Sequence, residues 1–410
     1  MTAHNSPPAR SATLLLIGAC MSTVSAVVVA PVLPELEKQF SDASSLVPLV
    51  VGVPAITMAV VSPIVGALLD RFGRRYFIYA GLVLFSAAGM APLVLDSLPS
   101  IIGSRLLVGV ATAIVTTTCT VLIGDSFTGQ RRARFLALQT VANTVAAMVG
   151  LGVGGALGDI SWRAPFAFFA IGVVLLPVMA LIRPPARDEV IRAEADAWQV
   201  RSRSWLSLVP IVLLTAVAAV VVSLPVFETS TLLEESGVTS TGLIGAISAL
   251  NGFATVVGAI VVREVVDAPA GRLLAVGFGL AALGYGIVAS STSLDGIVIG
   301  VVVIVGLMVA NFGGGVLLPT LLIWGTRDLT YDRRGRGTGL WHTGFFGGQF
   351  ATPILFDTLS DRSGSPFTTL GMTAVLCLAI AIGAGVAGPR RRDRWQPARP
   401  APRYTDDRAW

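Results

Sequence analysis

Long apolar runs, separated by short polar segments, recur along almost the whole chain of 410 residues. Each run has roughly 20 residues, the length that an α-helix needs to cross the hydrocarbon core of a bilayer. Only 13% of the residues are charged, against about 25% in soluble domains, and the mean hydropathy is +0.78. Backbone groups in lipid must bond within their own segment, so the runs predict membrane-spanning helices.

We expect twelve such spans, and therefore an all-α membrane protein. The first six are expected at 11–33, 46–69, 76–96, 99–124, 136–158 and 164–183. The second six are expected at 206–227, 241–263, 272–291, 294–324, 337–357 and 367–388. The chain then divides into an N-terminal tail (1–10), a six-helix bundle (11–183), a linker (184–205), a second six-helix bundle (206–388) and a basic tail (389–410).

The charges between the runs predict which side of the membrane each connection faces. The connections that we assign to the inside carry Arg71, Arg74, Arg75, Arg131, Arg132, Arg134, Arg333, Arg334, Arg336, Arg390, Arg391, Arg392 and Arg394. Those assigned to the outside carry Glu35, Glu37, Asp42, Asp96, Glu228, Glu234, Glu235 and Asp295. The positive-inside rule therefore predicts a cytoplasmic (inner) membrane protein with both termini in the cytoplasm.

The remaining composition argues against several other classes of protein. The net charge of +5 does not indicate nucleic-acid binding, because the basic residues gather in the connections and the tail. Cys20, Cys119 and Cys377 lie inside apolar runs, in no disulfide or zinc spacing. The sequence has no clustered nucleophiles, bases or metal ligands, so we expect no enzyme, metal or cofactor. The first run exceeds the apolar core of a signal peptide, and we expect it to be retained.

The connection between the second and third spans reads Gly66-Ala-Leu-Leu-Asp70-Arg71-Phe72-Gly73-Arg74-Arg75. It resembles the loop 2–3 signature of the major facilitator superfamily, G-x-x-x-D-R-x-G-R-R. The resemblance covers roughly residues 11–388. It implies the major facilitator fold, in which two pseudo-symmetric bundles of six helices enclose a substrate site near the middle of the membrane.

The resemblance also implies a conformational latch between the two bundles. Asp70 would accept hydrogen bonds from amides at the start of span eleven, expected near Gly337, and Arg74 would pair with Asp125. These contacts would hold the outward-facing state. The residues assigned to the latch are Gly66, Asp70, Arg71, Gly73, Arg74, Arg75 and Asp125. The alternative is that the arginines only set the topology.

Span four contains Arg105, followed four residues later by Gly109. This resembles the R-x-x-x-G motif of span four in the family. A charge inside a span is costly unless it faces protein or water, which favours a functional role in pairing with an acid or an anionic group during proton exchange. The alternative is that the side chain extends to the outer interface.

Span five carries a run of glycines that resembles the antiporter signature G-P-x-x-G-G, although Leu151 takes the place of the proline. Close helix packing explains small residues in a span equally well. The glycines that we assign to helix packing are Gly109, Gly150, Gly154, Gly155, Gly158, Gly347 and Gly348.

Few polar side chains are available for protons or substrate. Besides Arg105, the candidates are Glu35 at the end of span one and His342 in span eleven. The alternative is that Glu35 and Glu228 are ordinary outer-loop acids and that His342 is a neutral hydrogen-bonding group between helices. Candidates for lining the cavity are Thr23, Asn143, Asn251 and Asn311. Each of these is also explained as a hydrogen bond between helices.

The motifs together resemble the twelve-span drug:proton antiporters of the superfamily. The resemblance implies proton-coupled efflux of amphipathic small organic molecules, such as drugs or metabolites, by alternating access. The partners would be a small-molecule substrate, protons and the lipid bilayer, and we expect a monomer. One alternative is a proton symporter or facilitator that imports a small polar metabolite. Another, of a different class, is a non-transporting membrane sensor or scaffold.

Overall fold

The computed structural model describes residues 9–127, 129–180, 190, 208–235, 241–293 and 297–386. Within these residues, every element is an α-helix or a 3-10 helix. The predicted N-terminal tail except its last two residues, the predicted linker except Val190, and the basic C-terminal tail lie outside the described residues.

The first half of the chain forms six membrane-crossing segments. In chain order, its elements are α1 (Ala9–Ala19), α2 (Met21–Val27), η1 (Ala30–Val32), α3 (Leu33–Gln39), η2 (Ser41–Leu46), α4 (Leu49–Phe72), α5 (Arg75–Met90), η3 (Ala91–Leu93), α6 (Leu98–Ser126), α7 (Gly129–Gly158), α8 (Ala164–Ala167), η4 (Phe168–Ala170) and α9 (Ile171–Ala180). Spans one and six are therefore broken into short helices. Pro31 and Pro34 help to break span one, because proline removes a backbone donor.

The second half of the chain forms the other six segments. Its elements are α11 (Val209–Glu235), α12 (Thr241–Glu264), α13 (Ala270–Ala289), η6 (Ser290–Ser293), α14 (Ile297–Thr326), α15 (Tyr331–Ser363) and α16 (Pro366–Val386). Ten described segments are long and apolar enough to cross a bilayer, and a shorter apolar segment, Ala164–Met179, makes span six. The remaining crossing is α15, which is less hydrophobic because charged residues lie at both of its ends. Twelve crossings result, as the apolar runs predict.

Two helices begin earlier than the apolar pattern predicts. Span five was expected from residue 136, but α7 begins at Gly129. Span eleven was expected from residue 337, but α15 begins at Tyr331. Arg132 and Arg334 were predicted to lie in loops, and this is wrong: both are on helices and both are buried. Hydropathy alone misses these turns, because polar contacts with the other half compensate for burying the arginines.

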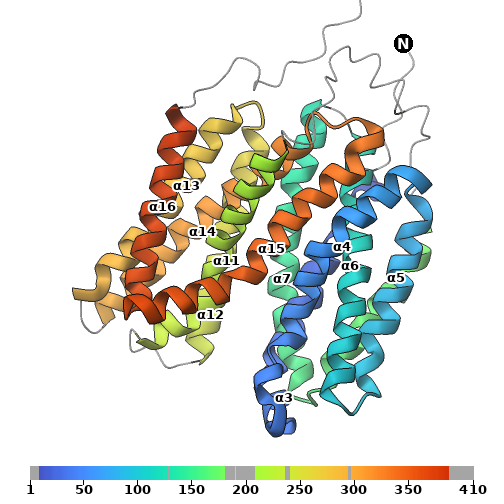
Figure 1. Ribbon diagram of the computed structural model, residues 1–410, viewed down its shortest axis with the longest axis horizontal. Coiled ribbons are helices and arrows are strands. Elements are labelled where there is room, and N and C mark those ends of the chain that lie inside the picture. The colour runs from blue at the N-terminus through green and yellow to red at the C-terminus, as the bar shows by residue number, and fades with distance from the viewer. Residues whose placement is uncertain are drawn as a thin grey trace, which may run out of the picture.

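Each half has its own apolar core, and the halves lie side by side (Figure 1). Buried side chains such as Phe85 and Ile101 cluster in the first half, and Phe278 and Leu317 in the second. The halves contact each other mainly through α4 with α15 and through α7 with α12. In Figure 1, the bundles meet at the upper end, where α4 ends and α15 begins, and diverge toward the lower end. We call the upper end the latch end.

Glycines allow several helix pairs to approach closely. A Cβ on Gly154 would collide with the backbone of Val28, and one on Gly348 with the backbone of Ala216. Gly109 lies against Pro54 in the same way. Gly150 and Gly158 meet the valine side chains of span one. Five of the seven glycines assigned to packing therefore lie in tight helix contacts.

The other two assigned glycines differ. A Cβ on Gly155 would have no atom within 4 Å among its neighbours, and one on Gly347 would make only an ordinary contact with Ala59 at 3.9 Å. Their assignment to close packing is therefore wrong. Both lie on the same helices as packing glycines, but one residue away, and a helix turns about 100° per residue, toward a different neighbour.

We predict that Gly154→Ala lowers the melting temperature of the purified protein, whereas Gly155→Ala does not. The added methyl group at residue 154 must displace the backbone of Val28, and overpacking of this kind costs about 1–3 kcal/mol. The methyl group at residue 155 enters open space. Thermal unfolding in detergent, followed by size-exclusion chromatography, compares the two variants. Equal melting temperatures would contradict the packing described for α7.

Candidate functional site

A tight turn after α4 brings a carboxylate of the first half against a helix of the second. Gly73 ends α4 with φ of 88°, a conformation that favours glycine. Asp70, one turn earlier, accepts hydrogen bonds from the backbone N–H groups of Gly335 (2.8 Å) and Arg336 (3.0 Å). Gly66 makes this approach possible, because a Cβ there would collide with the backbone of Gly335. The carboxylate thus lies near the positive end of α15, where the helix dipole favours an anion.

A second carboxylate, Asp125 at the end of α6, joins arginines from both halves. Arg74 Nε donates to Asp125 Oδ2 at 2.9 Å, and Arg334 Nη1 donates to Asp125 Oδ1. Arg74 also donates to the backbone carbonyl of Tyr331 at 2.9 Å, and its guanidinium lies 3.7 Å from the centre of the Tyr331 ring. We call Asp70, Arg74, Asp125 and Arg334, with the amides of Gly335 and Arg336, the latch cluster.

The charges of the latch cluster balance. Two arginines and two carboxylates meet where their side chains are at most 5% exposed. Removing one member of a buried ion pair leaves an uncompensated charge, which is far more costly than losing a surface pair. Two of the residues assigned to the latch do not take part: Arg71 and Arg75 are exposed and lie outside this cluster.

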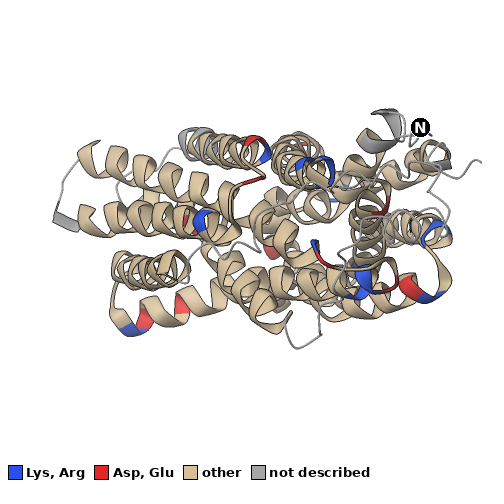
Figure 2. Ribbon diagram, turned by 90° about the horizontal axis from the view of Figure 1, so that it is seen from above, with Lys and Arg blue, Asp and Glu red and all other residues tan. Residues whose placement is uncertain are grey.

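A second set of contacts closes the latch end between other helices. Gln130, in the first turn of α7, donates to both carboxylate oxygens of Asp267 at 2.8 Å. Asp267 lies in the connection between α12 and α13. Arg132 Nη2 donates to the backbone carbonyl of Thr326, at the end of α14, at 2.7 Å. Figure 2, which looks onto this end, shows the charged residues at a few places on largely uncharged helices.

Farther from the latch end, the halves are joined by polar contacts of α15. Thr343 Oγ1 donates to the backbone carbonyl of Ala59 on α4 at 2.7 Å. Thr117 Oγ1 on α6 lies within hydrogen-bonding distance, 3.1 Å, of His342 Nδ1. His342 is buried beside the rings of Trp341 and Phe346. The structure therefore places this predicted histidine at the contact between the halves.

Arg105 lies in the interior of the first half. Its side chain is 0% exposed, and its guanidinium lies 4.7 Å from the ring centre of Phe169 and 5.6 Å from that of Phe166. Its three side-chain nitrogens make no hydrogen bond within the described residues. Cation–π contacts offset only part of the cost of burying a charge. The alternative that Arg105 extends to the outer interface does not fit this burial.

The other predicted polar residues are dispersed. Glu35 on α3 is exposed, and Thr23 and Asn143 are half-buried. Asn251 is buried on α12. Asn311 accepts a hydrogen bond from Thr255 Oγ1 at 3.2 Å, as expected of a hydrogen bond between helices.

Glu228 does not lie in an outer loop. It is buried on α11, which continues to Glu235, past the expected end of span seven. The assignment of Glu228 to an outside connection is therefore wrong. Hydropathy misses its burial because Glu228 follows the expected end of the span by one residue.

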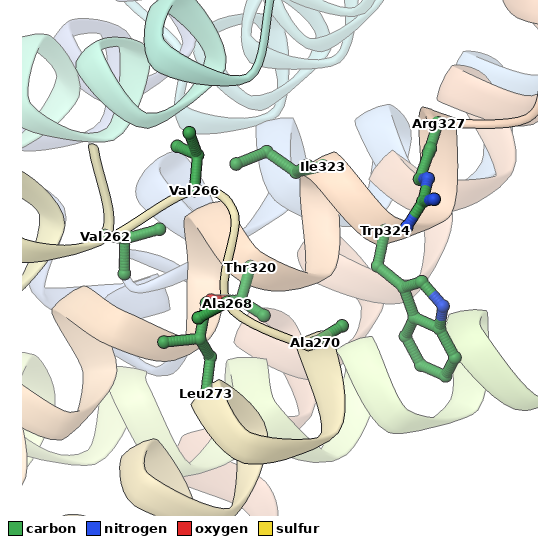
Figure 3. Close-up of a pocket in the computed structure, with 9 residues that line it drawn as sticks. All are labelled: Val262, Val266, Ala268, Ala270, Leu273, Thr320, Ile323, Trp324 and Arg327. Carbon is green, nitrogen blue, oxygen red and sulfur yellow. The ribbon is translucent and has the colours of Figure 1, made fainter. Parts of the chain in front are cut away.

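The pocket in Figure 3 lies within the second half, between α12, α13 and α14. It is lined by Val262, Val266, Ala268, Ala270, Leu273, Thr320, Ile323, Trp324 and Arg327. None of the residues predicted to bind substrate or protons is among them. It is therefore not the central site between the halves.

The family model described as "Major Facilitator Superfamily" matches residues 15–353, which include the latch cluster and all or most of each of the first eleven crossings. The chain belongs to the major facilitator superfamily. It is therefore a multi-pass membrane protein, and the fold and family implied by the loop 2–3 motif are confirmed.

Two curated relatives of this facilitator are drug-resistance proteins. Multidrug resistance protein 1 of Bacillus subtilis is 30% identical over 178 residues, covering 43% of this chain and 46% of the relative. Quinolone resistance protein NorA of Staphylococcus aureus is 28% identical over 204 residues, covering 49% of this chain and 52% of the relative. The chain thus spans about half the length of the curated relatives that it matches.

Solved structures share the fold over almost the whole facilitator. The human organic anion transporter MFSD10 (TETRAN) has a TM-score of 0.74 at 18% identity, with 92% of this chain and 100% of that chain covered. The proton:xylose symporter XylE has a TM-score of 0.75 at 13% identity, with 93% and 95% covered. At these identities, the likeness extends to the fold alone.

We predict that Asp125→Asn opens the latch end of this facilitator. The amide leaves Arg74 and Arg334 without their shared negative charge, and breaking a buried ion pair costs about 3–5 kcal/mol. Labelling of Leu322→Cys by a membrane-impermeant maleimide measures the opening, because Leu322 of α14 is buried in an apolar cluster made mainly of first-half residues. Labelling should become several-fold faster.

The matched control for this prediction is Glu264→Gln. Its carboxylate is 62% exposed and lies 3.6 Å from Arg263 of the same half, so labelling should keep its original rate. An unchanged rate in Asp125→Asn would show that the latch cluster does not hold the halves together.

Proposed function

We propose that this facilitator exports amphipathic small organic molecules from the cell, in exchange for protons, by alternating access. The observation that carries the proposal is the ionic contact between the halves at one end of a molecule whose halves diverge at the other. Such an arrangement fits one of two discrete states, and opening the latch end requires these contacts to break.

The latch end is proposed to face the cytoplasm of the cell. Arginines gather there, on α4, α5, α7 and α15, whereas Glu35, Glu37 and Asp96 belong to the opposite end. The positive-inside rule places the basic end in the cytoplasm. On this orientation both termini are cytoplasmic, and the described conformation corresponds to an outward-facing state.

The direction and the class of cargo are supported by the drug-resistance relatives and by the chemistry of the spans. The helices carry few polar groups, and a pocket between them would bind its cargo loosely, through apolar contacts. An importer of a small polar metabolite needs several hydrogen-bonding groups directed at its substrate. Asn311, one of the candidates for that role, is instead bonded to Thr255 within the second half.

Proton coupling is proposed to involve Arg105 and a carboxylate. A buried arginine without a hydrogen-bond partner in the described residues is ready to pair with an anion when the helices move. Glu228 is the buried carboxylate of the described second half. A carboxylate in such surroundings can exchange its proton as its access to water changes.

Transport by the purified full-length protein tests the proposal. Proteoliposomes with an imposed pH gradient and a panel of lipophilic dyes should show dye movement coupled to proton counterflow. Proton movement in the same direction as a polar metabolite would favour an importer instead. A protein that moves no compound under any gradient would contradict transport of this class.

We predict that Asp70→Asn abolishes gradient-driven dye transport without reducing expression. The substitution removes the negative charge that faces the amides of Gly335 and Arg336 on α15, so the charge-assisted contact at the latch end is weakened. The dye assay in proteoliposomes measures the effect. Arg71→Gln, which changes an exposed charge of the same connection, is the control and should retain transport. Full transport by Asp70→Asn would rule out a latch function.

We predict that Arg105→Ala abolishes coupling to the pH gradient and that Arg105→Lys restores only part of it. Lysine keeps the charge but lacks the planar fork that binds a carboxylate through two hydrogen bonds. The measurement is dye accumulation with and without the gradient. Wild-type accumulation in Arg105→Ala would assign this arginine to structure alone.

A further inference from the structure

Buried polar side chains link the two halves at a level deeper in the membrane than the latch cluster. Gln139 Nε2 on α7 donates to Thr120 Oγ1 on α6 at 3.0 Å. Thr117, one turn earlier on α6, is 3.1 Å from His342 Nδ1 on α15. Residues three apart share one face of a helix. One face of α6 therefore carries hydrogen bonds to a helix of each half.

Two buried polar atoms, Gln139 Oε1 and the Nε1 of Trp341, the neighbour of His342 along the chain, make no hydrogen bond within the described residues. The side chains are 3% and 7% exposed, respectively. Buried polar groups are normally hydrogen-bonded, so unpaired ones indicate a group that is satisfied in another state or by a ligand.

The described contacts of Trp341 are aromatic and apolar. The Trp341 indole stacks on Phe345, with ring centres 5.5 Å apart and planes 6° apart. Trp341 belongs to an apolar cluster that also contains Leu136 of α7 and Leu322 of α14. The described contacts of Gln139 and Trp341 include no carboxylate, lysine or arginine.

We propose that these side chains form a subsite for an uncharged, planar aromatic substrate that carries one hydrogen-bond donor and one acceptor. The donor bonds to Gln139 Oε1, the acceptor receives the indole N–H of Trp341, and the ring packs on the Trp341–Phe345 stack. The inference rests on the proposed function, because the groups are covered here and are uncovered when the halves separate at the latch end.

The same chemistry disfavours a cationic substrate. A cation that enters this subsite loses its hydration without gaining a carboxylate partner, which is costly. The faces of Trp341 and Phe345 attract cations but offset only part of that cost. We therefore expect selection for uncharged molecules, which distinguishes this subsite from a pocket that binds any lipophilic compound.

Three probes of one shape test the subsite. Acridone is planar and uncharged, with a ring N–H donor and a carbonyl acceptor; 10-methylacridone lacks the donor; 10-methylacridinium is a cation. Their binding to the full-length protein in lipid nanodiscs is measured by fluorescence, with empty nanodiscs subtracted. Acridone should bind about fivefold more tightly than 10-methylacridone, as one hydrogen bond allows. It should bind at least tenfold more tightly than the cation.

Two variants assign the two hydrogen bonds. Gln139→Met should weaken acridone binding about fivefold and leave 10-methylacridone binding unchanged, since only acridone donates to Gln139. Trp341→Phe keeps an aromatic ring and should weaken both uncharged probes, because both retain the carbonyl. Trp324→Phe, which changes the tryptophan of the pocket in Figure 3, is the matched control and should affect neither.

The outcomes separate the subsite from the proposed function. Cation binding as tight as that of acridone, or an equal effect of Gln139→Met on both uncharged probes, overturns the subsite. Tight acridone binding with no acridone movement in proteoliposomes supports the subsite and contradicts the proposed function. Gradient-driven movement of 10-methylacridinium, combined with weak acridone binding, contradicts the subsite and supports the proposed function.

Discussion

A single buried carboxylate, Asp125, is the point at which the two halves of this facilitator depend on each other. It belongs to the first half, and its two oxygens are divided between Arg74 of the same half and Arg334 of the other. Arg74 also lies 3.9 Å from Asp70 of its own half, but Arg334 belongs to the other half. Separating the halves therefore takes Arg334 away from Asp125, and breaking a buried ion pair is costly. Asp70, bonded to the amides of α15, adds a second contact that is lost in the same motion.

Much of this arrangement can be predicted from the sequence, because lipid imposes a simple rule on the backbone. The number of crossings follows from apolar length, and the facilitator family from the residues between Gly66 and Arg75. The pairing of Arg74 with Asp125 is present where the resemblance implies it. These features depend on local composition and on one short motif, both of which are visible without a structure.

The parts that the sequence does not reveal depend on burial of charge by the partner half. Hydropathy assigns Arg334 to a loop, and only the position of Asp125 across the interface explains why a helix can begin before it. Glu228 is buried, although it looks like a loop acid. Gly154 and Gly155 are the same residue type, yet only Gly154 lies close to a neighbouring helix. Sequence spacing does not tell which way each residue faces.

Near the latch end, the seam between α4 and α15 brings backbone against backbone. Gly66 meets Gly335, and Gly339 meets the backbone at Ser62 and Pro63. Helices whose side chains interlock must move those side chains past one another as they separate. Two helices that meet through glycines can separate there without such side-chain rearrangement. At this part of the seam, the barrier to switching would then depend mainly on the few polar contacts between the helices. A single substitution can change one of these contacts without repacking the whole interface.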